Sequence, residues 1–164
     1  MTGPRRRDSM ALILALAFAL ALALGAPVHA AEPALPGTRT VVTRHAFEAL
    51  LARTEAAVSA NKMGLVAQAS ASHGAAGRGV KIAGNAVLMV FRNDYAVRML
   101  QASVPAGIEA PLRLYVTENP DGSASLTYRT PSAVFSPYRN DKLDALAKEL
   151  DPIFERIVRD AGGS

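Results

Sequence analysis

Residues 112–130 contain two stretches of alternating apolar and polar residues separated by a short polar segment. The apolar positions are Leu112, Leu114 and Val116 in the first stretch and Ala124, Leu126 and Tyr128 in the second. Between them lies Asn119-Pro120-Asp121-Gly122, a combination that favours a tight turn. Alternation with a period of two is typical of strands that bury one face, so the pattern predicts an antiparallel hairpin. A chain with such a hairpin has to cover the apolar face of a sheet with other elements.

Three further segments have the composition of strands. Residues 38–44 are rich in β-branched residues, and residues 65–72 alternate in a way that predicts a half-buried strand. Residues 86–91 are apolar at every position, which is typical of a strand buried on both faces in the interior of a sheet. The glycine-rich segment 73–84 is expected to form a loop or a short helical turn.

Two segments before the hairpin have helical spacing. Residues 45–61 form an amphipathic pattern with Thr43 as a candidate N-cap. Its apolar-face positions are Phe47, Leu50, Leu51, Thr54 and Val58. Residues 94–103 predict a short helix whose Val97 and Leu100 point inward.

A long helix is expected near the end of the chain, after a loop over residues 131–137. Asn140 or Asp141 is the expected N-cap. The helix carries a continuous apolar stripe made of Leu143, Leu146, Ala147, Leu150, Ile153, Phe154, Ile157 and Val158. Pro152 lacks a backbone donor and is expected to kink this helix or divide it in two.

The resulting order, β-α-β-β-α-β-β-α, predicts an α+β fold with a single, mostly antiparallel sheet and helices packed on one face. Residues 38–161 are expected to form one domain after a flexible lead over residues 31–37. The chain has no cysteine, so its stability has to come from packing rather than from disulfides.

The first 30 residues have the pattern of an export signal. Three arginines at positions 5–7 precede an apolar run of 17 residues, Met10–Ala26, and Val28-His29-Ala30 is compatible with signal peptidase. The alternative is a retained membrane anchor, for which the run is at the lower limit of length. We favour cleavage between Ala30 and Ala31, general secretory export to the periplasm or the medium, and no stable membrane anchor in the mature protein.

The charge of the mature chain argues against nucleic acid as a partner. The chain has 18 Lys and Arg and 14 Asp and Glu, and the signal holds three of the arginines and Asp8, which leaves a net charge of +2. The remaining basic residues are scattered, whereas a nucleic-acid binder concentrates them in a stripe.

Several short motifs have a familiar order along the chain. They are a strand–helix opening that closes at Met63-Gly64, His73 after the second strand, Phe91-x-Asn93, Pro111-Leu112-x-Leu114, Asp121-Gly122 and Leu126-x-Tyr128-x-x-Pro131. From about residue 40 to residue 160 the chain thereby resembles the bacterial family named domain of unknown function 302. The resemblance implies a compact α+β domain, often dimeric, with no assigned reaction. The family commonly has Phe-Gly-Asn-Pro where this chain has Phe91-Arg92-Asn93-Asp94.

Candidate site residues are few. His73 is the best, since it follows a polar strand face and precedes a glycine-rich loop, and Asn93 and Tyr128 are the other candidates. We assign no cofactor and no metal, because His73 has no further donors nearby in the sequence; soft copper ligands would have to come from Met63, Met89 or Met99. No serine-nucleophile motif or carboxylate pair is present in the sequence.

Two hypotheses of function follow. The first is a non-catalytic binding or interaction module, in which a second subunit of a homodimer or a small apolar ligand covers the free face of strand 86–91. The alternative is a metal-handling protein or enzyme with a site around His73, with Asn93 and Tyr128 converging on it. We favour the first, because function requires a site and the sequence assembles none.

Signal cleavage is testable by intact mass. We expect the exported protein to begin at Ala31, because the charged start, the apolar run and the Val-x-Ala ending occur together. A mature form that retains Met1–Ala30 would instead indicate a membrane-anchored protein.

Overall fold

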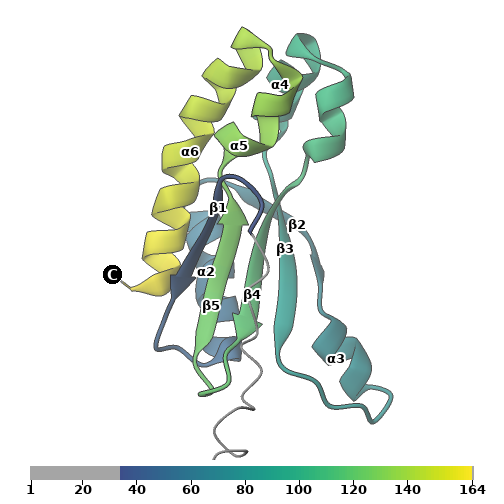
Figure 1. Ribbon diagram of the computed structural model, residues 1–164, viewed down its shortest axis with the longest axis vertical. Coiled ribbons are helices and arrows are strands. Elements are labelled where there is room, and N and C mark those ends of the chain that lie inside the picture. The colour runs from purple at the N-terminus through teal and green to yellow at the C-terminus, as the bar shows by residue number, and fades with distance from the viewer. Residues whose placement is uncertain (1–33, 164) are drawn as a thin grey trace, which may run out of the picture. The chain divides into compact units, whose positions relative to one another are not determined.

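Five strands form one sheet in the computed structural model, which describes residues 34–163 (Figure 1). The strands are β1 (Thr38–Val42), β2 (Gly64–Ala69), β3 (Asn85–Phe91), β4 (Leu112–Glu118) and β5 (Ala124–Arg129). Their order in space is β1-β5-β4-β3-β2, and every neighbouring pair is antiparallel. The expected α+β class, the order of the main elements and the hairpin, here β4–β5, are confirmed.

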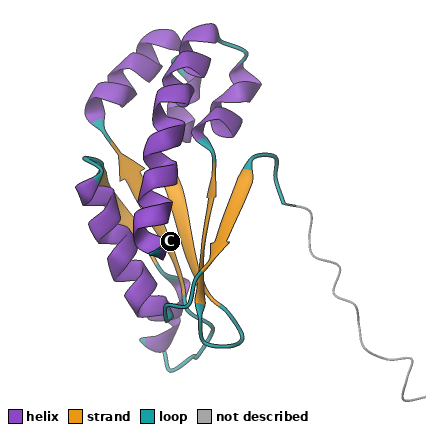
Figure 2. Ribbon diagram, turned by 90° about the vertical axis from the view of Figure 1, so that its left-hand side faces the viewer, coloured by secondary structure: helices purple, strands orange, loops and turns teal. Residues whose placement is uncertain are grey.

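Two long helices, α2 (Phe47–Ala60) and α6 (Asp141–Gly162), pack against each other and on one side of the sheet (Figure 2). The shorter helices are α3 (Ala71–Ala76), α4 (Asn93–Ala102) and α5 (Pro131–Phe135), with 3₁₀ turns η1 (Pro105–Glu109) and η2 (Ser136–Tyr138). Within residues 34–163 no helix has the length and apolarity needed to cross a bilayer.

The core lies between these two helices and the sheet. Leu88, Leu114 and Leu126 are fully buried on the same face of the sheet. Leu88 on β3 faces Leu114 on β4, and Leu126 on β5 faces Val116 on β4. The apolar stripes expected for α2 and α6 are buried in the same core. Because alternate residues of a strand point to opposite faces, the other face of the sheet is not part of this core.

Strand β2 differs from expectation. It ends at Ala69 rather than Ser72, because Ser70 caps α3 with its hydroxyl oxygen. Its residues are almost all exposed, since β2 is at the edge of the sheet, and Val66 at a bulge is 54% exposed. The expectation of a half-buried strand is therefore wrong, because alternation alone does not distinguish an edge strand from an inner one.

Strand β3 has neighbours on both sides but is buried on one face only. Ala86, Leu88 and Val90 point into the core, whereas Val87, Met89 and Phe91 are half-buried on the opposite face. Within the described chain nothing packs over this second face deeply enough to bury it. Burial on both faces, expected from the composition, is thus not reached by the single chain.

The buried face of α4 is also different. Met99 is buried, and Tyr95, one turn earlier, packs against the core, while Val97 and Leu100 are 45% and 44% exposed. The expectation that Val97 and Leu100 point inward is wrong, because the helix turns its Tyr95–Met99 ridge toward the core.

In the C-terminal part, the expected loop is wrong and so is the expected division of the last helix, whereas the alternative of a kink at Pro152 stays a prediction. Residues 131–137 are helical rather than a loop, because Thr130 accepts a hydrogen bond from the Ala133 amide and Pro131 occupies the first helical turn. Pro152 does not divide the last helix, since α6 runs without a break through this exposed position. Burial of Leu150, Ile153 and Phe154 on either side offsets the lost hydrogen bond.

Leu126→Ala is expected to lower the free energy of unfolding by about 2–5 kcal/mol, because it opens a cavity under a fully buried side chain. Thr127→Ala, at the next position on the opposite face, serves as the control and is expected to cost about 1 kcal/mol or less. Urea unfolding followed by circular dichroism measures both. Equal losses would mean that the two faces of β5 are equally buried.

Candidate functional site

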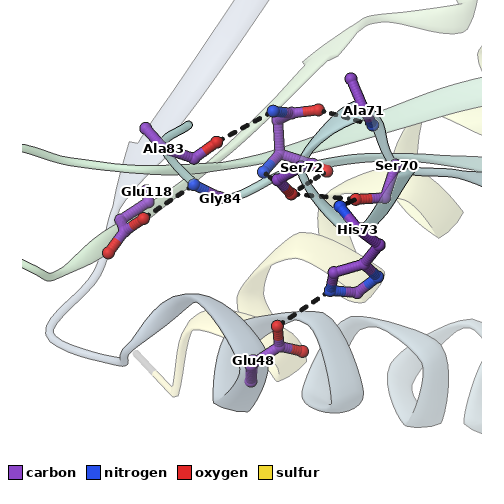
Figure 3. Close-up of polar contacts among 9 residues, drawn as sticks. Glu48, Ser70, Ala71, Ser72, His73, Ala83, Gly84 and Glu118 are labelled. Atoms are coloured by element: carbon purple, nitrogen blue, oxygen red, sulfur yellow. Dashed lines mark hydrogen bonds and ion pairs between the residues drawn. The ribbon is translucent and has the colours of Figure 1, made fainter. Parts of the chain in front are cut away.

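His73 lies in the short helix α3, at the lower end of the sheet in Figure 1. Its Nε2 is 3.0 Å from Oε1 of Glu48 on α2 (Figure 3). Its ring meets the Phe47 ring edge-on, with 6.1 Å between the centroids. The His73 and Glu48 side chains are 52% and 71% exposed. The pair therefore bridges α3 to α2 at the surface, where ion pairs contribute little to stability.

The polar groups around His73 hold the glycine-rich connection in place. Asn85 accepts a hydrogen bond from the Ala71 amide at 3.1 Å, and the Asn85 amide donates to the Ser72 hydroxyl at 3.1 Å. The Gly84 amide donates to Glu118 at 2.7 Å (Figure 3). A Cβ on Gly84 would come within 2.6 Å of the Phe47 ring, so this glycine is needed for packing. These contacts give the glycine-rich segment 73–84 a structural role as the connection between α3 and β3.

The structure does not bring the three candidate residues together. Asn93 is exposed at the start of α4, beyond the opposite end of β3 from α3, and a seven-residue strand spans roughly 20 Å. Tyr128 is buried on the helix-covered side of β5, where it stacks on Phe154 at 6.2 Å. Burial raises the pKa of the Tyr128 phenol, and the Glu155 carboxylate adds to the effect. The geometry thus lacks the convergence that the alternative hypothesis requires.

The possible metal ligands are also dispersed. Among residues 34–163 no three His, Asp or Glu side chains gather in a way that could hold an ion. Met63 and Met99 line a small apolar pocket of about 30 Å³ beneath α4, whereas Met89 belongs to the opposite face of the sheet. None of the three methionines lies in a group with His73.

The sheet face that α2 and α6 do not cover, which we call the open face, is the one that the first hypothesis expects a second subunit or an apolar ligand to cover. Its apolar part combines Val87, Met89 and Phe91 of β3 with Ala67 and Ala69 of β2. Its polar part lies on β4, β5 and β1 and includes Arg113, Tyr115, Thr127, Arg129 and Thr40. Apolar surface of this extent beside an unpaired strand is typical of an interaction site.

A family model described as "Domain of unknown function DUF302" matches residues 39–161. The chain belongs to this family. A solved structure of an uncharacterized conserved DUF302 protein from Bacillus stearothermophilus has the same fold, with a TM-score of 0.69 and 16% sequence identity. The match covers 77% of this chain and 98% of that one. No curated protein matches the chain.

Arg92 and Asp94, which stand where the family resemblance implies Gly and Pro, bind each other. The Arg92 Nε and Nη2 atoms donate to the two carboxylate oxygens of Asp94 at 2.7 and 3.0 Å. The guanidinium also lies 4.1 Å from the centroid of the Tyr95 ring. The hydrogen bond from Arg92 lowers the pKa of Asp94. In this chain the ion pair links Arg92, which precedes α4, to Asp94 in its first turn.

His73→Ala is expected to change the free energy of unfolding by about 1 kcal/mol or less, because the imidazole contacts only an exposed carboxylate and a ring edge. Thermal unfolding of the wild type, His73→Ala and Glu48→Gln measures this effect. We also expect zinc and copper titrations to give the same heats for all three proteins. Stoichiometric metal binding by the wild type alone would contradict this expectation and support the metal-handling hypothesis.

Proposed function

We propose that the chain is an exported, non-catalytic interaction module that acts as a homodimer, in which the β2 strands of two copies pair edge to edge. The observation that carries the proposal is the exposed, uncharged edge of β2. An unpaired edge offers a row of backbone donors and acceptors that only another extended chain can satisfy in full.

The two edges of the sheet differ in how they are protected. β1 carries Arg39 and is followed directly by Arg44, and such charges discourage strand pairing. The sequence from Met63 to Gly77, which includes β2, has no charged residue other than His73 in α3. The bulge at Val66 interrupts the edge near its start and leaves Ala67–Ala69 as the regular part. This part favours a second strand, because its small side chains permit close approach.

The identity of the partner follows from the symmetry of the edge. Antiparallel pairing of two β2 strands about a two-fold axis gives the isologous contact found in most homodimers. Because β2 is uncharged, the arrangement brings no like charges together. The apolar part of the open face lies directly beside this edge, so the second copy also approaches Val87 and Met89. Edge pairing would join the apolar parts of the two open faces into one continuous surface.

Export is the second part of the proposal. It rests on the signal pattern of residues 1–30, which lie outside the described residues. A domain without cysteine has no disulfide framework to form after export. Dimerisation would add buried surface that stabilises the folded chain in its place.

Ala67→Lys tests the proposed dimer. We expect the wild type to be a dimer at micromolar concentration and Ala67→Lys to weaken the dimer at least about tenfold, because each copy then brings a lysine to the paired edge, close to the two-fold axis. Val42→Lys, at a position 70% exposed on the opposite edge strand, is the matched control and is expected to leave the dimer intact. Sedimentation equilibrium measures the association, and thermal unfolding of diluted samples checks the fold of each monomer.

Native mass spectrometry distinguishes the other possible occupants of the open face. A wild-type monomer that carries a small apolar molecule would contradict the dimer and point to a ligand-binding module. A dimer that survives Ala67→Lys and dissociates with Val42→Lys would place the interface at β1 instead.

A further inference from the structure

A hollow of about 280 Å³ lies between the start of β4, the end of β5, η1 and α5. It is lined by Leu35, Glu109, Leu112, Arg113, Arg129 and Val134. These residues come from the segment before β1, from η1, from β4 and β5, and from α5. The hollow therefore combines apolar side chains with two guanidinium groups at one point of the surface.

The two arginines are cross-strand neighbours. In the β4–β5 ladder Leu114 faces Tyr128, so Arg113 and Arg129, one residue further along each strand, lie side by side on the opposite face. Like charges in directly opposite positions destabilise a sheet unless a counter-charge lies between them. Among the described residues neither arginine forms an ion pair, and Arg113 forms no hydrogen bond through its side chain.

Arg129 is held in position by the fold. Its Nη2 donates to the carbonyl oxygen of Ala133 in α5 at 3.0 Å, which fixes the plane of the guanidinium. Its Nε is buried and has no acceptor within the described chain. This nitrogen is inaccessible to a ligand, so an anion in the hollow would act on Arg129 as the counter-charge that its guanidinium lacks among the described residues. Arg113 is exposed and free to move toward the same anion.

The remaining lining residues define the ligand more closely. Glu109 is held by the Tyr138 hydroxyl, which donates to its carboxylate at 3.0 Å. With one carboxylate and two guanidinium groups, the hollow has a net charge of +1 and suits a single negative charge. Leu35, Leu112 and Val134 offer apolar contact to the rest of the ligand. A planar carboxylate matches the geometry of guanidinium donors better than a spherical ion does.

We infer that this hollow binds a small monocarboxylate with an apolar body, such as a medium-chain fatty acid. The carboxylate lies between Arg113 and Arg129, and the apolar body lies along Leu35 and Val134. The site is separate from the β2 edge, so the inference goes beyond the proposed dimer.

Octanoate is the probe, with acetate and octan-1-ol as its anion-only and apolar-only counterparts. Calorimetric titration of the purified protein is expected to give one octanoate site per chain, with both counterparts at least about tenfold weaker. Arg113→Gln is expected to weaken octanoate at least about tenfold, as for loss of one charge-assisted hydrogen bond. Arg39→Gln removes an exposed arginine from the other face of the sheet and is expected to leave the affinity unchanged. A higher salt concentration is expected to weaken the binding of octanoate to the wild type, because salt screens the attraction between the carboxylate and the arginines.

The inference is overturned if octanoate shows no saturable binding, if octan-1-ol binds equally well, or if Arg113→Gln and Arg39→Gln behave alike. Thermal unfolding of Arg113→Gln checks that the variant is folded. Sedimentation of the same samples separates loss of octanoate binding from loss of the dimer, so failure of the two proposals can be told apart.

Discussion

Burial of one face of the sheet beneath α2 and α6 is the interaction on which the rest of the structure depends. Leu88, Leu114 and Leu126 are fully buried on this face, and the apolar stripe of α6 continues without interruption past Pro152. This contact fixes the phase of every central strand, because a shift of one residue would turn all three leucines to the opposite face. The register then determines which residues occupy the open face, including the apolar strip of β3 and the pair Arg113 and Arg129.

A two-layer fold of this kind leaves half of its sheet without cover. Polar residues on β5 and β1 suit that exposure, and the hydroxyl groups of Thr40 and Thr127 form a hydrogen bond of 2.9 Å between these two strands. Val87, Met89 and Phe91 do not suit it, and they lie next to the one edge without charges. The asymmetry within a single face is the physical reason to look for a partner at β2 and for a small ligand at the arginine pair.

The sequence predicts those elements whose signal is local. The hairpin and the helix stripes follow from periodicity, and the structure confirms them at Leu126 and along α2 and α6. The position of β2 at the edge of the sheet does not follow from periodicity, because it depends on the order of the strands in the sheet. The buried face of α4 is likewise set by tertiary packing of Met99 rather than by its weak apolar pattern. The pairing of Arg113 with Arg129 depends on the register, which centres the hairpin on Asp121, eight residues from each arginine, rather than on the middle of the expected turn at residues 119–122.

The candidate site predicted from the sequence differs from the structure more than the predicted fold does, again because the site depends on contacts between distant parts of the chain. Sequence motifs point to side chains that can act as acids, bases or metal ligands, and His73 is the most distinctive of these in the sequence. In the structure His73 contacts Glu48 and Phe47 and thereby links α3 to α2. Many polar residues can fill such a role. An interaction surface instead consists of several residues on neighbouring strands. Here these are the free backbone groups of β2, the apolar side chains at alternate positions of β3, and the two arginines in opposite positions on β4 and β5. Such features become visible only when the strand order is known, because each depends on what lies on the neighbouring strand.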